Sequence, residues 1–210
     1  MANYIIGVDE VGWGALSGPV VVVGVRAPKD WFIEGLADSK KLKASSEKKL
    51  YEMRDKLGDL IEKKEITWHL AARSSVEIDK MSPAAALKSS YIEVFNSLYD
   101  DASHIISDGI LNFEGLGVEH MSMESMVKAD TKIPTVMAAS ILAKTYRDEL
   151  MKIMHQLHPM YGWDSNAGYA SRDHLEAIAK YGPSPLHRYS YAPMKNMQAN
   201  DPRQLSFDFS

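Results

Sequence analysis

The sequence of 210 residues contains no cysteine, which excludes disulfide bonds, thiolate nucleophiles and thiolate metal ligands. Long apolar runs are also missing. The longest, around PVVVVGV, has only the length of a strand, so the sequence predicts no membrane span. No basic, apolar leader is visible at its start, and we therefore expect a cytoplasmic location.

The sequence has no excess of basic residues either. Its 24 Lys and Arg stand against 28 Asp and Glu, whereas nucleic-acid-binding proteins are usually basic. The bases nevertheless gather in two places, the segment DSKKLKASSEKK (38–49) and the stretch from Arg172 to Lys195. Taken alone, each cluster is either a solvated face or a surface that contacts phosphates.

The pattern of apolar residues predicts an α/β domain with a mixed sheet. Two β-branched runs, NYIIGVD and GPVVVVGVRAP, predict a hairpin, and further strands are expected near residues 65–74, 104–110 and 121–130. Helices are expected over residues 45–57, 83–99, 133–157 and 171–180. The glycine spacing in GWGALSG fits neither a dinucleotide-binding motif nor a P-loop, so no nucleotide cofactor is expected.

Four acidic residues occur where predicted strands end. Asp9 and Glu10 interrupt the apolar run GVDEVGWG, Asp108 precedes a glycine, and Asp130 ends the segment VKAD. An isolated ionised carboxylate is very costly to bury, and sites in open sheets form where strand ends meet. Hard cations such as Mg²⁺ bind oxygen ligands, so the four acids together suggest the divalent-cation site of an α/β nuclease. Any one of them could instead be a turn or cap residue.

Adjacent residues of an ideal strand point to opposite faces, so Asp9 and Glu10 cannot both reach one ion from such a strand. The glycines that follow allow a bend, and a backbone carbonyl or a second ion could also complete the geometry. Asp148, in TYRD within the predicted long helix, is expected to form an ion pair with a neighbouring base rather than join the site.

Six segments resemble, in order, the signature blocks of type 2 ribonuclease H: GVDEVGWGALSGPVVV, DSKKL, SDGI, VKAD, AASILAKTYRD and GYASRDHLEAIAKYGPSPLHRYSYAP. The resemblance runs from about residue 5 to residue 195. It implies a ribonuclease H-like mixed sheet flanked by helices over residues 1–157, a helical substrate-binding extension over 158–195 and a flexible tail over 196–210. It also implies an endonuclease that cuts the RNA strand of RNA–DNA hybrids, and cuts 5′ of single ribonucleotides embedded in duplex DNA.

The same resemblance implies roles for particular residues. Asp9, Glu10, Asp108 and Asp130 match the four catalytic acids, which use two divalent ions, Mg²⁺ or Mn²⁺, and leave 3′-hydroxyl and 5′-phosphate products. Backbone groups of Gly12, Trp13 and Gly14 match the segment that contacts the ribose 2′-OH region. Tyr169 matches the tyrosine that stacks on the sugar at the step from ribonucleotide to deoxyribonucleotide. Phosphate contacts are expected from Ser39, Lys40, Lys41, His187 and Arg188.

Trp13 departs from the family pattern, which usually has arginine there, or lysine in type 3 enzymes. We expect weaker phosphate affinity from this change, whereas the backbone contacts need no particular side chain.

Two alternative functions remain. One is a type 3-like enzyme that needs longer RNA, against which Tyr169 argues. The other is a catalytically silent hybrid-binding module, against which the four acids argue.

The last segment with a pattern of its own is QLSFDF, residues 204–209. It resembles the short peptides that dock on bacterial sliding clamps, and its two aromatic residues are unusual for a solvated tail. The alternative is a tail that is frayed or docked on the core. Besides a nucleic acid and a clamp as partners, we expect no association with a membrane, and we expect a monomer.

Overall fold

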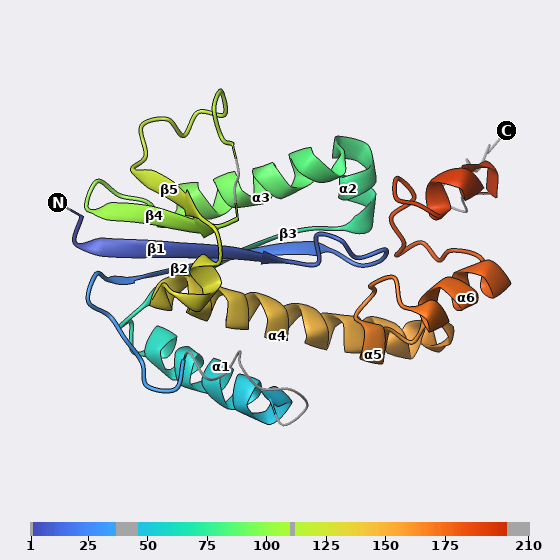
Figure 1. The fold of residues 1–210 in the computed structure, drawn as a ribbon, viewed down its shortest axis with the longest axis horizontal. Helices are drawn as coiled ribbons and strands as arrows, with labels where there is room; N and C mark the ends of the chain where they lie inside the picture. Colours follow the sequence, from blue (N-terminus) through green and yellow to red (C-terminus); the bar gives the residue numbers. More distant parts are fainter. Residues whose placement is uncertain (1, 37–45, 110–111, 201–210) are drawn as a thin grey trace, which may run out of the picture. The chain divides into compact units, whose positions relative to one another are not determined.

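The computed structural model describes residues 2–36, 46–109 and 112–200 (Figure 1). Five strands form one sheet in the order β3-β2-β1-β4-β5. They are β1 (Tyr4–Val11), β2 (Val20–Pro28), β3 (Thr67–Arg73), β4 (Ser103–Asp108) and β5 (Met123–Met126). Strand β1 runs antiparallel to β2 and parallel to β4, and β4 runs parallel to β5, which confirms the predicted mixed sheet.

The helices are α1 (Ser46–Glu62), α2 (Ser75–Met81), α3 (Pro83–Leu98), α4 (Pro134–Leu157), α5 (Trp163–Asn166) and α6 (Arg172–Tyr181). Short 3₁₀ helices span Ala129–Thr131, Pro159–Tyr161 and Met194–Asn200. The sequence pattern predicted α1, α3, α4 and α6 but missed the short helices α2 and α5. Among the described helices, none has the length and apolar character needed to span a membrane.

The described residues divide into two compact units. The first takes its residues from Met1–Val11, Val21–Ala72 and Lys88–Tyr146. The second takes its residues from Gly12–Val20, Arg73–Leu87 and Arg147–Ser210. Helix α4 contributes its residues up to Tyr146 to the first unit and its later residues to the second. The predicted domain boundaries stay a prediction.

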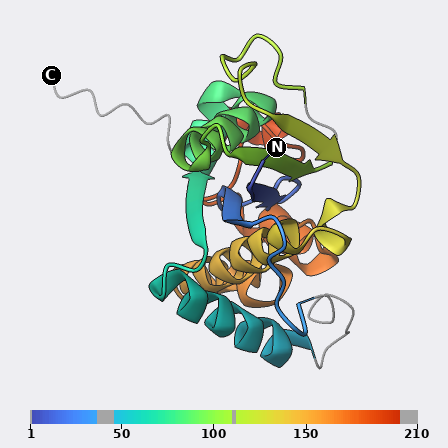
Figure 2. The same cartoon turned by 90° about the vertical axis from the view of Figure 1, so that its left-hand side faces the viewer.

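The first unit is built around strand β2. Residues Val20 to Val25 are all buried, as expected for a strand that is covered on both faces. Figure 2 shows α3 on one side of the sheet and α4 with α1 on the other. Glycines permit this close packing, since a Cβ on Gly7 would lie 2.2 Å from the backbone of Thr135, and one on Gly24 would lie 2.4 Å from Val94.

The second unit has an apolar core of its own. Its buried members include Leu16, Met151, Tyr161, Trp163, Ala177, Ile178 and Tyr189. Helix α6 begins after Ser171, whose Oγ accepts a hydrogen bond from the backbone N–H of His174 at 3.2 Å, and it ends at Gly182. From α2, Asp79 accepts hydrogen bonds from the backbone N–H groups of Tyr189 and Ser190, which fixes the chain after α6.

Candidate active site

The first pair of acids lies at the end of strand β1 in the first unit. Asp9 pairs with Val23 and Glu10 with Val22 in a regular antiparallel ladder that continues to Val11. The two carboxylates therefore point to opposite faces of the sheet, because the strand does not bend between them. Asp9 is 7% exposed, and its Oδ1 accepts a hydrogen bond from the backbone N–H of Glu10 at 2.9 Å.

Glu10 has a partner from helix α3. The buried phenol of Tyr91 donates a short hydrogen bond to Oε2 of Glu10. The ring of Tyr91 is packed against Phe95 and Phe113, with centroid distances of 5.8 and 5.6 Å. The position of the Glu10 carboxylate is thus set by a rigid aromatic cluster rather than by solvent.

Asp108 ends strand β4, the parallel neighbour of β1. Because Val8 pairs with Ser107, Asp108 reaches the same edge of the sheet as Asp9. Its Oδ1 accepts hydrogen bonds from the backbone N–H groups of Gly109 and Ala129, both at 2.9 Å. Asp130 directly follows Ala129 in the short 3₁₀ helix after β5, so the contact with Ala129 also ties the segment that carries Asp130 to Asp108.

The pKa of Glu10 shows that its carboxylate is influenced by that of Asp108. Burial raises the pKa of Glu10, the charge of Asp108 raises it further, and the hydrogen bond from Tyr91 opposes both effects. Burial also raises the pKa of Tyr91 well above its usual range, and the charges of Glu10, Asp9 and Asp108 add to the rise. Glu10 and Asp108 are therefore electrostatically coupled, and the charge of Asp9 acts on the same Tyr91, an arrangement that a cation would stabilise.

These residues fit a hard divalent ion in their chemistry, since all four supply carboxylate oxygens. Within the part of the chain that is described, however, no group of three or more Asp, Glu or His side chains converges closely enough to hold one ion. The carboxylates of Asp9, Glu10 and Asp108 are each engaged by a protein donor instead.

The glycine-flanked loop, residues 12–18, belongs to the second unit and rests on two buried arginines. The Arg147 side chain donates to the carbonyls of Pro19, Ser17 and Ala167 at 2.9, 3.0 and 2.7 Å. Burial lowers the pKa of Arg147 to about 10, with the charge of Arg188 also lowering it, so the guanidinium stays charged at neutral pH. A Cβ on Gly12, which has φ of +83°, would lie 2.2 Å from Nε of Arg147.

The second arginine, Arg188, donates to the carbonyls of Gly18 and Trp13 at 3.0 and 2.8 Å. The hydroxyl of Tyr191 donates to the same Trp13 carbonyl at 3.0 Å. The Trp13 side chain itself is 38% exposed. Its backbone is therefore held while its indole remains accessible.

Tyr169 lies in the same unit, just before helix α6, and its side chain is 41% exposed. Its hydroxyl accepts a hydrogen bond from the backbone N–H of Gly12 at 3.1 Å. The guanidinium of Arg147 lies over its ring, 5.4 Å from the centroid. The structure thus brings together Gly12 and Tyr169, two residues that the sequence analysis connected only through the family resemblance.

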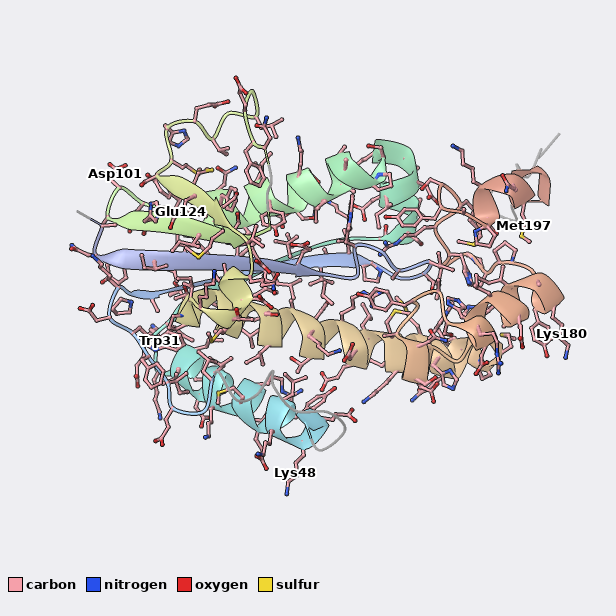
Figure 3. The ribbon with its side chains drawn as sticks, viewed as in Figure 1. Trp31, Lys48, Asp101, Glu124, Lys180 and Met197 are labelled. Atoms are coloured by element: carbon pink, nitrogen blue, oxygen red, sulfur yellow. The ribbon has the colours of Figure 1, made fainter. Side chains whose placement is uncertain are left out.

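The predicted phosphate contacts stay a prediction. His187 and Arg188 are fully buried, and Arg188 donates to backbone carbonyls of the loop. Ser39, Lys40 and Lys41 lie outside the described residues, as does the segment 204–209. Within the two basic clusters, Lys48 and Lys180 point outward from α1 and α6 (Figure 3).

Tyr91 and Arg147 are functional candidates that the sequence analysis missed. The only local signal for Arg147 was its place beside Asp148, and the charge of Asp148 does raise the pKa of Arg147. The ion pair expected for Asp148 stays a prediction. Tyr91 gave no signal, because a tyrosine on the apolar face of a helix is ordinary core.

Comparison with known sequences gives one consistent family. The family model of Ribonuclease HII matches residues 6–194. The chain is 38% identical over 198 residues to a Ribonuclease HII of Oceanobacillus iheyensis, covering 94% of this chain and 72% of that protein. It is 40% identical over 193 residues to one of Neisseria meningitidis serogroup B, covering 92% and 94%.

Solved structures show the same fold. The ribonuclease H2 of Pyrococcus horikoshii OT3 superposes with a TM-score of 0.73 at 24% identity, over 93% of this chain and 97% of that one. The RNase HII in a PCNA:RNase HII complex from Archaeoglobus fulgidus gives 0.69 at 25% identity, over 89% and 94%. A Bst-RNase HIII in complex with Mn²⁺ gives 0.68 at 18% identity, over 97% and 71%.

Proposed function

Because the chain belongs to the ribonuclease HII family, and so is a ribonuclease H endonuclease, we propose that Asp9, Glu10, Asp108 and Asp130 are its catalytic acids. The observation that carries the proposal is the coupling of Glu10 to Asp108 at neighbouring strand ends, under the hydrogen bond from Tyr91. Carboxylates that are partly buried close to one another repel each other when ionised. Such an arrangement is typical of a functional site that binds a cation.

The proposed cofactor is a pair of divalent ions, Mg²⁺ or Mn²⁺, held by these four acids. When bound, such ions generate a nucleophile near neutral pH and stabilise charge on the leaving oxygen. The protein's own contribution is to hold the carboxylates ready. Tyr91 fixes Glu10, and the backbone N–H groups of Gly109 and Ala129 fix Asp108. Hydrolysis would leave a 3′-hydroxyl and a 5′-phosphate.

The proposed substrates are RNA–DNA hybrids and duplex DNA that contains a single ribonucleotide. For the second substrate, the enzyme must recognise one 2′-hydroxyl, the group that distinguishes RNA from DNA. One support is the exposed ring of Tyr169, whose hydroxyl accepts a hydrogen bond from the backbone of Gly12. The other is the fixed backbone of the loop, since Arg147 and Arg188 donate hydrogen bonds to its carbonyls. We propose that Tyr169 stacks on the sugar at the junction while the loop backbone contacts the 2′-hydroxyl region.

A gel assay separates this proposal from its alternatives. One substrate is a duplex with one embedded ribonucleotide, the other is a long RNA–DNA hybrid, and both are tested with and without Mg²⁺. We expect metal-dependent cutting of both, with the first cut 5′ of the ribonucleotide. A type 3-like enzyme would cut only the long hybrid, and a silent binding module would cut neither.

We also propose that residues 204–209, QLSFDF, dock on a sliding clamp. The complex of PCNA with an archaeal RNase HII supports this for a member of the family. The test measures clamp affinity of the full chain and of a chain that lacks residues 203–210, with Phe207→Ala and Phe209→Ala as finer variants. Unchanged affinity after the deletion would remove the proposal.

A further inference from the structure

Two buried histidines form a hydrogen-bonded chain in the second unit. Nε2 of His174 lies 3.1 Å from Nε2 of His187 and accepts a hydrogen bond from the Trp163 indole N–H, also at 3.1 Å. At the far side of His187, Nδ1 accepts a hydrogen bond from the backbone N–H of Ser184 at 2.9 Å. Both histidines and Trp163 have no exposed surface. A buried polar network of this kind must satisfy all its members.

The partners determine where the protons are. A backbone N–H can only donate, so Nδ1 of His187 carries a lone pair and its proton sits on Nε2. That Nε2–H donates to Nε2 of His174, which therefore carries a lone pair as well. The remaining proton of His174 is on Nδ1, and it donates to the backbone carbonyl of Tyr169 at 2.8 Å. Both imidazoles are neutral in this arrangement.

The chain of bonds thus ends on the backbone of Tyr169. The same carbonyl accepts a hydrogen bond from the N–H of Ser171 at 2.8 Å, and the N–H of Tyr169 donates to the carbonyl of Asn166 at 2.9 Å. His174 is itself fixed, because its backbone N–H donates to the side chain of Ser171. The position of the exposed Tyr169 ring therefore depends on a buried imidazole five residues later in the chain.

We propose that His174, supported by His187, is a positioning residue that holds Tyr169 in the orientation needed to recognise a single ribonucleotide. This inference rests on the proposed role of Tyr169. His174 has no exposed surface, so it is expected to act on the substrate only through Tyr169. Its effect is expected on the choice between substrates more than on the cleavage step, since a long hybrid offers the enzyme many registers.

The same geometry makes the hydrogen bonds of His174 sensitive to pH. A proton added to Nε2 of His174 would turn its acceptor into a donor that faces two other donors, those of Trp163 and His187. The ionisable neighbours are Tyr161, whose ring lies 4.7 Å from that of His187, His158 beside Trp163, and Arg147 over the Tyr169 ring. On α6 itself, Arg172 and Asp173 are exposed. Burial lowers the pKa of His174, so the neutral form prevails at neutral pH.

A matched pair of variants tests the proposal. The amide of His174→Asn lies near the place of Nδ1 and keeps a donor for the Tyr169 carbonyl, whereas that of His174→Gln lies near the place of Nε2 and does not. Both variants disturb the core, so stability alone does not distinguish them. We expect His174→Gln to lose about ten-fold more kcat/KM on a single embedded ribonucleotide than on a long hybrid, as for other orienting residues. His174→Asn should keep the wild-type ratio.

A double-mutant cycle shows whether His174 acts through Tyr169. In a Tyr169→Ala background, His174→Gln should change the substrate ratio no further. Lowering the pH through the folded pKa of His174, which burial places below its ordinary value of about 6.5, should reduce the ratio in the wild type and leave it unchanged in Tyr169→Ala. Equal losses on both substrates, additive effects in the cycle, or a ratio independent of pH would each overturn the proposal.

A readout without catalysis separates this inference from the proposed function. The backbone N–H of Gly12 donates to the Tyr169 hydroxyl, so its hydrogen exchange reports whether the tyrosine is in place. We expect a lower protection factor for exchange at Gly12 in His174→Gln than in His174→Asn, and a lower one in the wild type in mild acid than at neutral pH. If the wild type failed to cut a single ribonucleotide, the proposed function would fall while this result could still stand. An unchanged protection factor at Gly12 in both conditions would overturn the positioning role.

Discussion

The phenolic hydroxyl of Tyr91 donates its hydrogen bond to the carboxylate of Glu10 across 81 positions of the chain. This contact joins helix α3 to the end of strand β1 and determines how one of the four proposed catalytic acids is held. It also keeps a carboxylate in a place where burial raises its pKa. The site thus holds negative charge that the protein's own groups do not neutralise.

The first prediction concerns Glu10→Gln in metal-free protein. The pKa of Glu10 is raised in the folded state, so the ionised side chain opposes folding as the pH rises through its ordinary value of about 4.5 and on through the folded value. The neutral amide removes this cost and still accepts from Tyr91. We expect about 0.5–2 kcal/mol of added stability at pH 7.5 in urea unfolding, with cleavage lost.

Glu124→Gln on strand β5, labelled in Figure 3, is the control for Glu10→Gln. The side chain of Glu124 is half exposed. This control should change stability by less than about 0.5 kcal/mol. If Glu10→Gln is instead less stable than the wild type at pH 7.5, burial of the charge is not what raises the pKa of Glu10.

The second prediction compares two glycines on either side of Trp13. Gly12 has φ of +83° and no room for a Cβ beside Arg147, whereas Gly14 has open space around it. We expect Gly12→Ala to destabilise the protein by more than about 1 kcal/mol, and Gly14→Ala to leave its stability nearly unchanged. If the loop backbone approaches nucleic acid closely, Gly14→Ala should nevertheless weaken hybrid binding. Thermal unfolding and fluorescence anisotropy measure the two effects, and normal binding by Gly14→Ala would contradict the close approach.

The sequence predicted the fold because its signals were local. The continuous run of valines marked β2 as a strand, and the acids at the ends of β1 and β4 marked one edge of the sheet. The helix predicted over residues 171–180 corresponds to α6. Each of these signals depends on neighbours in the chain.

The roles of His187 and Arg188 could not be found in this way. A basic residue in a polar segment is usually exposed, and so a phosphate contact was the natural prediction. In the structure Arg188 is buried. Its guanidinium donates hydrogen bonds to the carbonyls of Gly18 and Trp13, which lie 170 and 175 positions earlier in the chain. Tyr91 escaped notice for a similar reason, since its acceptor Glu10 lies 81 positions earlier in the chain.

The third prediction restores the charge missing from the loop. The Trp13 side chain is exposed while its carbonyl is held by Arg188 and Tyr191, so Trp13→Arg should leave the loop in place. We expect tighter hybrid binding and a salt dependence steeper by roughly one released counterion. Affinity at several salt concentrations measures both, with Trp13→Gln as the uncharged control. An unchanged slope, or cutting of plain DNA by Trp13→Arg, would contradict the division between backbone recognition and phosphate attraction.

The fourth prediction concerns stability in acid. The pKa of His174 is lowered in the folded state, so its contribution to stability is complete above about pH 6.5 and is lost as the pH falls through the folded value. Urea unfolding between pH 8 and pH 5 should show this loss in the wild type. His174→Gln, which has no imidazole to protonate, should show a shallower dependence. Identical pH dependence in the two proteins would exclude a buried neutral His174 as its source.

The most direct test of the central claim measures cleavage and binding in the same samples of wild type, Asp9→Asn and Asp108→Asn. The amide in Asp108→Asn can still accept from the N–H groups of Gly109 and Ala129, so the fold should survive while a charged ligand is lost. We predict Mg²⁺-dependent cutting of an RNA–DNA hybrid by the wild type, a loss of at least about 100-fold in both variants, and hybrid affinity within a few-fold of wild type. Near-normal Mg²⁺-dependent turnover in either variant would contradict the assignment of these acids as the catalytic site.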